Sequence, residues 1–99
     1  MTAVVNIGTM ITSSPRVQGG RPVIAGTSVT VQRIVTWYKL GYSPEEIACE
    51  IDHLSLAQIY AALTYYHANR EAIEADIAAD EDEYERLSRE HSPQQPIHV

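Results

Sequence analysis

The sequence predicts a mainly α fold, in which a helix-turn-helix unit of three helices follows short N-terminal β-strands and precedes a C-terminal helical extension. Two complete helix start signals lie close together, SPEE at residues 43–46 and SLAQ at residues 55–58. Short β-branched segments interrupted by Gly and Pro come before these signals, as is typical of strands joined by tight turns. A helix-favouring segment that contains neither Gly nor Pro follows them until Pro93.

Composition indicates one small domain. The chain has 99 residues, of which 44% are hydrophobic and 20% are charged. No apolar run approaches the roughly 20 residues that a membrane-spanning helix needs, and no secretion signal is visible, so we expect a cytoplasmic protein without a membrane partner. The lone cysteine, Cys49, has no second cysteine to pair with, and we expect it to be buried or half-buried.

The N-terminal part is expected to contain little regular structure. We predict a flexible arm over residues 1–9 and short strands within residues 10–12, 22–24 and 28–31 of a domain that spans residues 10–70. Strands this short form a marginal sheet by themselves. They must therefore pack on the helices or pair with a second copy of the chain, and we predict a homodimer formed through them.

Apolar spacing predicts the three helices. Val31, Ile34, Val35 and Tyr38 recur at helical intervals after a possible N-cap at Thr30. SPEE and SLAQ are capping boxes, in which the serine and the fourth residue satisfy free backbone amides reciprocally at the start of the second and third helices. A three-residue turn, residues 52–54, separates these two helices, which is the usual length in a helix-turn-helix.

Charge divides the chain near residue 70. The first 70 residues carry five Lys or Arg against four acids, whereas the remainder carries nine acids against two arginines. We predict an acidic amphipathic helix over residues 71–90 and a disordered tail over residues 91–99. This pattern is typical of a helix that binds in a groove of a partner protein. The candidate contacts are Ile73, Ile77, Tyr84, Arg86 and Leu87. The alternative is a solvated helix that extends the third one or packs on a second copy.

A helix-turn-helix presents the start of its second helix to the DNA major groove. The candidate base-facing residues are Ser55, Ala57, Gln58 and Ala61, and the candidate phosphate contacts are Arg21, Arg33 and Lys39. The third helix has no Lys or Arg before Arg70, although basic side chains supply most DNA affinity. A structural three-helix core without a nucleic-acid role therefore remains an alternative.

Catalytic and metal-binding motifs are missing from the sequence. The four histidines, His53, His67, His91 and His98, have no metal-ligand spacing, and the acids of the C-terminal part are not paired in an apolar context. The glycines form no phosphate-binding loop, and no serine has a nucleophile-elbow context. We expect a protein that is not an enzyme and needs no cofactor or metal.

The stretch from Ile11 to Ile77 resembles the bacterial family called domain of unknown function 433. The shared motifs are GRPVI at residues 20–24, GT at 26–27, GYS at 41–43, EEI at 45–47, LS at 54–55, AL at 62–63 and YY at 65–66. This resemblance implies a homeodomain-like three-helix unit preceded by short strands. It also implies a VapB-like antitoxin, which represses its operon through the DNA-binding part and covers a PIN-like ribonuclease toxin with its C-terminal part.

Two departures from the family pattern bear on DNA contact. Asp52 and His53 stand where the family often has Tyr-Pro, and Ser28 stands where it commonly has Arg. The resulting hypothesis is an antitoxin-like component of a bacterial type II toxin-antitoxin pair, which binds and neutralises the toxin and contacts operator DNA. The alternative is a structural dimeric adaptor without a nucleic-acid role.

Overall fold

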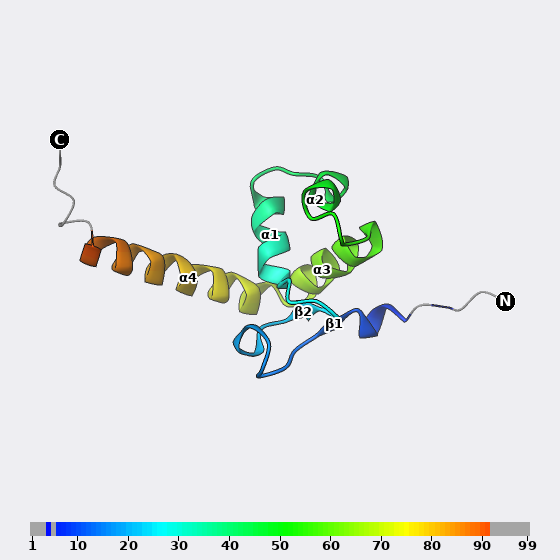
Figure 1. Ribbon diagram of the computed structural model, residues 1–99, viewed down its shortest axis with the longest axis horizontal. Coiled ribbons are helices and arrows are strands. Elements are labelled where there is room, and N and C mark those ends of the chain that lie inside the picture. The colour runs from blue at the N-terminus through cyan, green and yellow to red at the C-terminus, as the bar shows by residue number, and fades with distance from the viewer. Residues whose placement is uncertain (1–3, 5, 92–99) are drawn as a thin grey trace.

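The structure is a computed structural model that describes residue 4 and residues 6–91. It confirms a mainly α fold, with two short strands near the N-terminus followed by four helices (Figure 1). The elements are η1 (Ile7–Thr9), β1 (Ile11–Thr12), η2 (Gln18–Gly20), β2 (Val23–Ile24), α1 (Val31–Lys39), α2 (Pro44–Glu50), α3 (Leu56–Ala68) and α4 (Arg70–His91). No helix in the described part of the chain is long and apolar enough to cross a membrane.

The two strands form a small antiparallel sheet beneath the helices. Ile11 pairs with Ile24 and Thr12 with Val23, and an isolated bridge joins Val23 to Thr30. The predicted strand at residues 28–31 is wrong, because Val31 already begins α1 and the Thr30 side chain accepts the Arg33 amide at 3.0 Å. Part of the predicted flexible arm forms the single turn η1, while residues 1–3 and 5 lie outside the described residues. Of the predicted disordered tail, His91 ends α4, and residues 92–99 lie outside the described residues.

The helix-turn-helix prediction is confirmed. Both capping boxes are formed: the Ser43 hydroxyl accepts the Glu46 amide at 3.1 Å, and the Ser55 hydroxyl accepts the Gln58 amide at 3.2 Å. In return, the Ser43 backbone amide donates to the Glu46 carboxylate at 2.8 Å, and the Ser55 backbone amide donates to the side-chain oxygen of Gln58 at 2.7 Å. These caps hold α2 and α3 as separate helices on either side of a turn. Cys49 of α2 is exposed, in contrast to the expectation that it would be buried.

The core lies between α1, α2, α3 and the sheet. Its fully buried side chains include Ile24 from β2, Ile34 from α1, Ile47 from α2 and Ile59 from α3. Burying side chains of this kind contributes about 1.5–3 kcal/mol each before conformational entropy is counted. This shared core fixes the angle at which α3 presents its outer face.

The long C-terminal helix is a separate helix and not a continuation of α3. The chain leaves the helical conformation at Asn69, whose φ and ψ are −133° and 41°, and the Asn69 side-chain amide donates to the Tyr65 carbonyl at 3.1 Å. Such a local bond offers the backbone an alternative to helix. The first turns of α4 pack against α1 and α3, whereas its last turns extend away from every other element (Figure 1).

Candidate functional site

The outer face of α3 lines an apolar groove that faces the N-terminal segment. Its volume is about 500 Å³. From α3 the groove is lined by Ala57, Tyr60, Ala61, Thr64, Tyr65 and Ala68, and from the N-terminal segment by Ile7, Gly8, Met10 and Ile11. Two of the predicted DNA-facing residues, Ala57 and Ala61, therefore lie beside apolar side chains, and the groove lining contains no Lys or Arg among the described residues.

The other two predicted DNA-facing residues hold the start of α3. Ser55 and Gln58 bond each other's backbone amides, so the side-chain oxygen of Gln58 is already an acceptor. Recognition of adenine by Gln uses both the oxygen and the nitrogen of the amide. Gln58 would have to release the Ser55 amide before making that contact, and losing a capping bond costs about 1 kcal/mol.

Two of the three predicted phosphate contacts are bound by α4. The Arg21 guanidinium donates to both carboxylate oxygens of Asp80, at 2.7 and 2.8 Å, and Gln32 donates to the same carboxylate at 2.5 Å. Lys39 donates to both carboxylate oxygens of Glu74, at 2.7 and 3.0 Å. The bond from Arg21 and then that from Gln32 lower the pKa of Asp80 to about 2, so this carboxylate is ionised at neutral pH.

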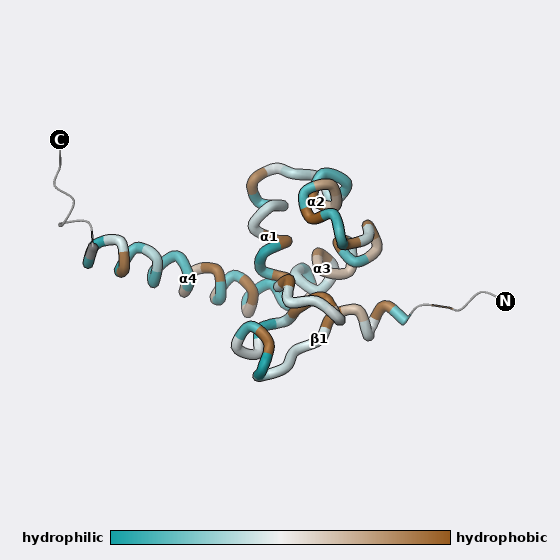
Figure 2. Tube along the Cα trace, in the orientation of Figure 1, coloured by the Kyte–Doolittle hydropathy of each residue, from teal (hydrophilic) through white to brown (hydrophobic). Residues whose placement is uncertain are grey.

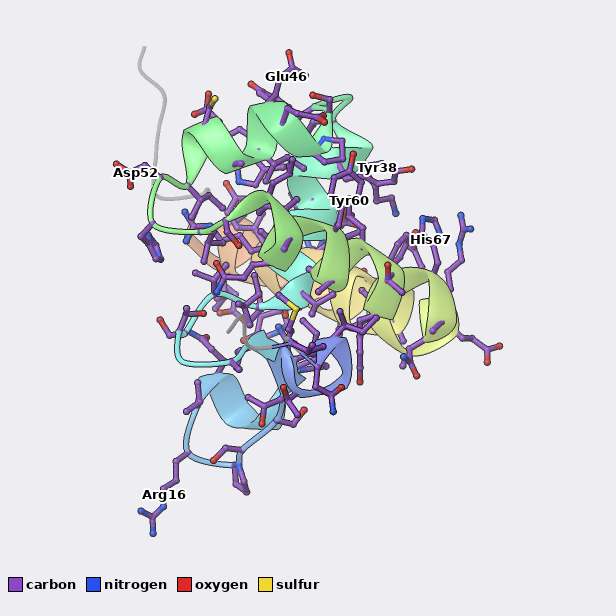
Figure 3. The ribbon with its side chains drawn as sticks, turned by 90° about the vertical axis from the view of Figure 1, so that its right-hand side faces the viewer. Arg16, Tyr38, Glu46, Asp52, Tyr60 and His67 are labelled. Carbon is purple, nitrogen blue, oxygen red and sulfur yellow. The ribbon has the colours of Figure 1, made fainter. Side chains whose placement is uncertain are left out.

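The two ion pairs tie α4 to the segment before β2, where Arg21 lies, and to the end of α1, where Lys39 is the last residue. The hydrogen bond from Gln32 to Asp80 adds a contact near the start of α1. Glu74 also accepts the hydroxyl of the buried Tyr66, and the bonds from Lys39 and then Tyr66 lower the pKa of Glu74. The third predicted phosphate contact, Arg33, is exposed. Arg16 is exposed as well, at the tip of the loop before η2, where its side chain points away from the helices (Figure 3).

The four apolar residues among the predicted partner contacts divide into three groups. Ile73 is only 1% exposed and belongs to the core, so in this structure it is a structural residue and is not accessible to a partner. Ile77 is half-buried against the same core. Tyr84 and Leu87, in contrast, are 73% and 43% exposed, on the part of α4 that projects from the domain.

These four apolar residues form one stripe of α4, because their spacings of four, seven and three residues return to the same side of a helix. Figure 2 shows hydrophobic positions recurring along this otherwise hydrophilic helix. Arg86 does not share the stripe. It lies two residues from Tyr84, about 200° around the helix, and it pairs with Glu83 at 3.6 Å and Glu90 at 3.1 Å.

Sequence reasoning missed the groove itself, although it named Ala57 and Ala61 of its lining as DNA contacts, and it missed the acceptors on α4. The groove could have been found, because α3 carries apolar or small residues on a second side besides its core stripe, including Ala57, Tyr60 and Ala61. The pairing of Arg21 with Asp80 joins residues 59 positions apart, and no local pattern marks it. Within the described residues, no three His, Cys, Asp or Glu side chains come together to hold a metal ion.

Comparisons with known proteins identify relatives of the trihelical domain, which comprises the two-stranded sheet and the helices α1, α2 and α3. Residues 11–66 match the model of a family described as "Protein of unknown function (DUF433)". The crystal structure of a DUF433 member protein from Anabaena variabilis ATCC 29413 is similar, with 30% sequence identity and a TM-score of 0.66 over 71% of this chain and 69% of that chain. The search of curated proteins finds no match. The family model covers the sheet, α1, α2 and most of α3, and it ends before α4 begins.

Proposed function

This chain belongs to the DUF433 family, whose description names no activity, and we propose that it is a non-enzymatic, antitoxin-like component of a bacterial type II toxin-antitoxin pair, the function that the family resemblance implies. In this proposal the trihelical domain carries α4, and the projecting turns of α4 bind and neutralise the toxin, a PIN-like ribonuclease. The start of α3 is the candidate contact with operator DNA.

The observation that carries the proposal is the apolar stripe of α4, which continues beyond the domain that it packs against. Ile73 is buried in the core, yet Tyr84 and Leu87 remain exposed on the same side of the helix. A helix end without tertiary packing has little stability of its own in water. A stripe of this kind on an otherwise polar helix fits a protein groove, which would bury both side chains.

The charges on the projecting part of α4, outside the apolar stripe, suit a partner that binds RNA. The active site of a PIN-like ribonuclease is itself acidic, so Arg86 or Arg89 could pair with its carboxylates, while the acids of α4 occupy the surrounding basic surface that binds RNA. The ion pairs of Arg86 with Glu83 and Glu90 are exposed, and exposed pairs contribute little. Arg86 can therefore exchange these partners for others at small cost.

A second candidate function is a dimeric adaptor without a nucleic-acid role. The groove on α3 favours it, because Ile7 and Tyr60 beside the groove are 73% and 46% exposed, and a second copy would cover such apolar area. Sedimentation of the purified protein and co-purification with the product of the adjacent reading frame separate the two candidates. A dimer that captures no partner and shifts no upstream DNA would favour the adaptor.

We expect the double substitution Tyr84→Ala/Leu87→Ala to weaken toxin binding at least about 100-fold, because each buried apolar anchor contributes about 1.5–3 kcal/mol. The measurement is titration calorimetry with the partner that co-purifies with the wild-type protein. Asp82→Glu is the matched control, since it changes the same turn of α4 on the side away from the stripe and retains the charge. Equal affinities of the double variant and the control would exclude the stripe as the binding surface.

A further inference from the structure

Two cations of the trihelical domain are held by carboxylates of α4 in a geometry that also suits phosphate. Arg21 binds Asp80 with two parallel N–H···O bonds, at 2.7 and 2.8 Å, and Gln32 adds a third donor to one of the same oxygens. A planar guanidinium that binds a carboxylate in this way binds a phosphate equally well. Arg21 and Gln32 are therefore arranged as an anion site.

The second cation extends this surface along α1. Lys39 contacts both oxygens of Glu74, at 2.7 and 3.0 Å, as it would contact two oxygens of a phosphate. The side chains of both ion pairs are between 33% and 48% exposed. Exposed pairs of this kind are screened by water and weakly held. A polyanion in solution can therefore compete with Asp80 and Glu74 for the two cations.

We propose that Arg21, Gln32 and Lys39 form a binding surface for the phosphate backbone of nucleic acid, and that α4 keeps this surface occupied with the carboxylates of Asp80 and Glu74. The turns of α4 that carry Glu74 and Asp80 thus compete with nucleic acid for these cations. Partner binding by the later turns, which carry Tyr84 and Leu87, is a separate property, because the competing carboxylates precede Tyr84. The inference goes beyond the proposed toxin binding, and each can fail without the other.

If these carboxylates compete with nucleic acid, the position of each negative charge on α4 matters as well as the net charge. Removing Asp80 and Glu74 should strengthen nucleic-acid binding, whereas removing two other acids of α4 should not. Glu71 and Asp82 provide this comparison, because both are exposed acids of α4 and neither forms an ion pair within the described residues. The variants Glu74→Gln/Asp80→Asn and Glu71→Gln/Asp82→Asn have the same net charge. A difference in DNA affinity between the two variants therefore results from the loss of the two contacts and not from the change in net charge.

The experiment measures fluorescence anisotropy of a duplex DNA of about 20 base pairs with the full-length protein alone, starting at about 50 mM salt. We expect Glu74→Gln/Asp80→Asn to bind about tenfold tighter than the wild-type protein and the control variant to bind as the wild-type protein does. Adding Arg21→Gln and Lys39→Gln should abolish the gain and flatten the dependence of log K on log salt by about 1.8, the slope for two phosphate contacts.

Circular dichroism establishes that each variant is folded. If the double variant does not fold, Asp80→Asn and Glu74→Gln are measured singly, each with an expected gain of about threefold. An equal gain in the control variant, an unchanged affinity, or a gain that survives removal of Arg21 and Lys39 would each overturn the proposal. Competition with inorganic phosphate at the same salt distinguishes a polyanion surface from a site for a single phosphate, and full displacement at about 1 mM would also overturn it.

Discussion

Ile73→Ala is expected to lower the free energy of unfolding by about 2–4 kcal/mol, because it leaves a cavity where a fully buried Ile joins α4 to the core. Small domains have total stabilities of about 5–15 kcal/mol, so the loss is a large share of the whole. For a domain of this size it corresponds to a decrease in Tm of about 10 °C or more. Urea denaturation followed by circular dichroism measures the change.

Leu87→Ala is the matched control for this substitution. It removes an apolar side chain from the same stripe of the same helix, but beyond the domain, where Leu87 is 43% exposed. We expect a change of less than about 0.5 kcal/mol. If Ile73→Ala were as mild as Leu87→Ala, then α4 would not be part of the folded domain in solution.

Truncation after Glu83 is expected to abolish partner capture and to leave the Tm of the remaining domain within about 2 °C of the full-length value. The shortened chain keeps Ile73, Ile77 and the ion pairs that α4 makes with Arg21 and Lys39, and it loses Tyr84 and Leu87. Thermal denaturation and affinity capture with the co-expressed partner give the two measurements.

A chain that ends at Asn69 provides the contrast. It lacks Ile73, Glu74 and Asp80, so the core loses a buried side chain and Arg21 and Lys39 lose their acceptors. We expect this shorter chain to be markedly less stable, which is why truncation at the charge boundary near residue 70 is not a clean test of partner binding. Full partner affinity in the chain that ends at Glu83 would contradict the assignment of Tyr84 and Leu87.

The helices of the trihelical domain could be predicted because their signals are local. Each capping box lies within four consecutive residues, and each apolar stripe repeats every three or four residues, so SPEE and SLAQ located α2 and α3 correctly. The change from strand to helix near Thr30 was less clear. Alternating Val29 and Val31 also fit a strand, and only the capping bond of Thr30 decides in favour of the helix.

The features that depend on tertiary packing could not be predicted in the same way. The stripe of α4 stays on the same side of the helix before and after Ile77, so the sequence does not show which part of the helix packs against the domain. The break at Asn69 has no Gly or Pro to mark it, and it depends on a side-chain bond back to Tyr65. The sequence identified the candidate residues, and the fold separates those that are buried from those that remain accessible.

Amide hydrogen exchange along α4 tests the central claim most directly, because local protection reports local stability. In the free protein, residues 73–77, whose amides are bonded within the helix, should exchange as slowly as the core of α1 and α3, and residues 82–90 should exchange rapidly. Addition of the partner should slow exchange in residues 82–90 and leave residues 73–77 unchanged. Uniform protection along the whole helix in the free protein, or no change at residues 82–90 in the complex, would contradict the account.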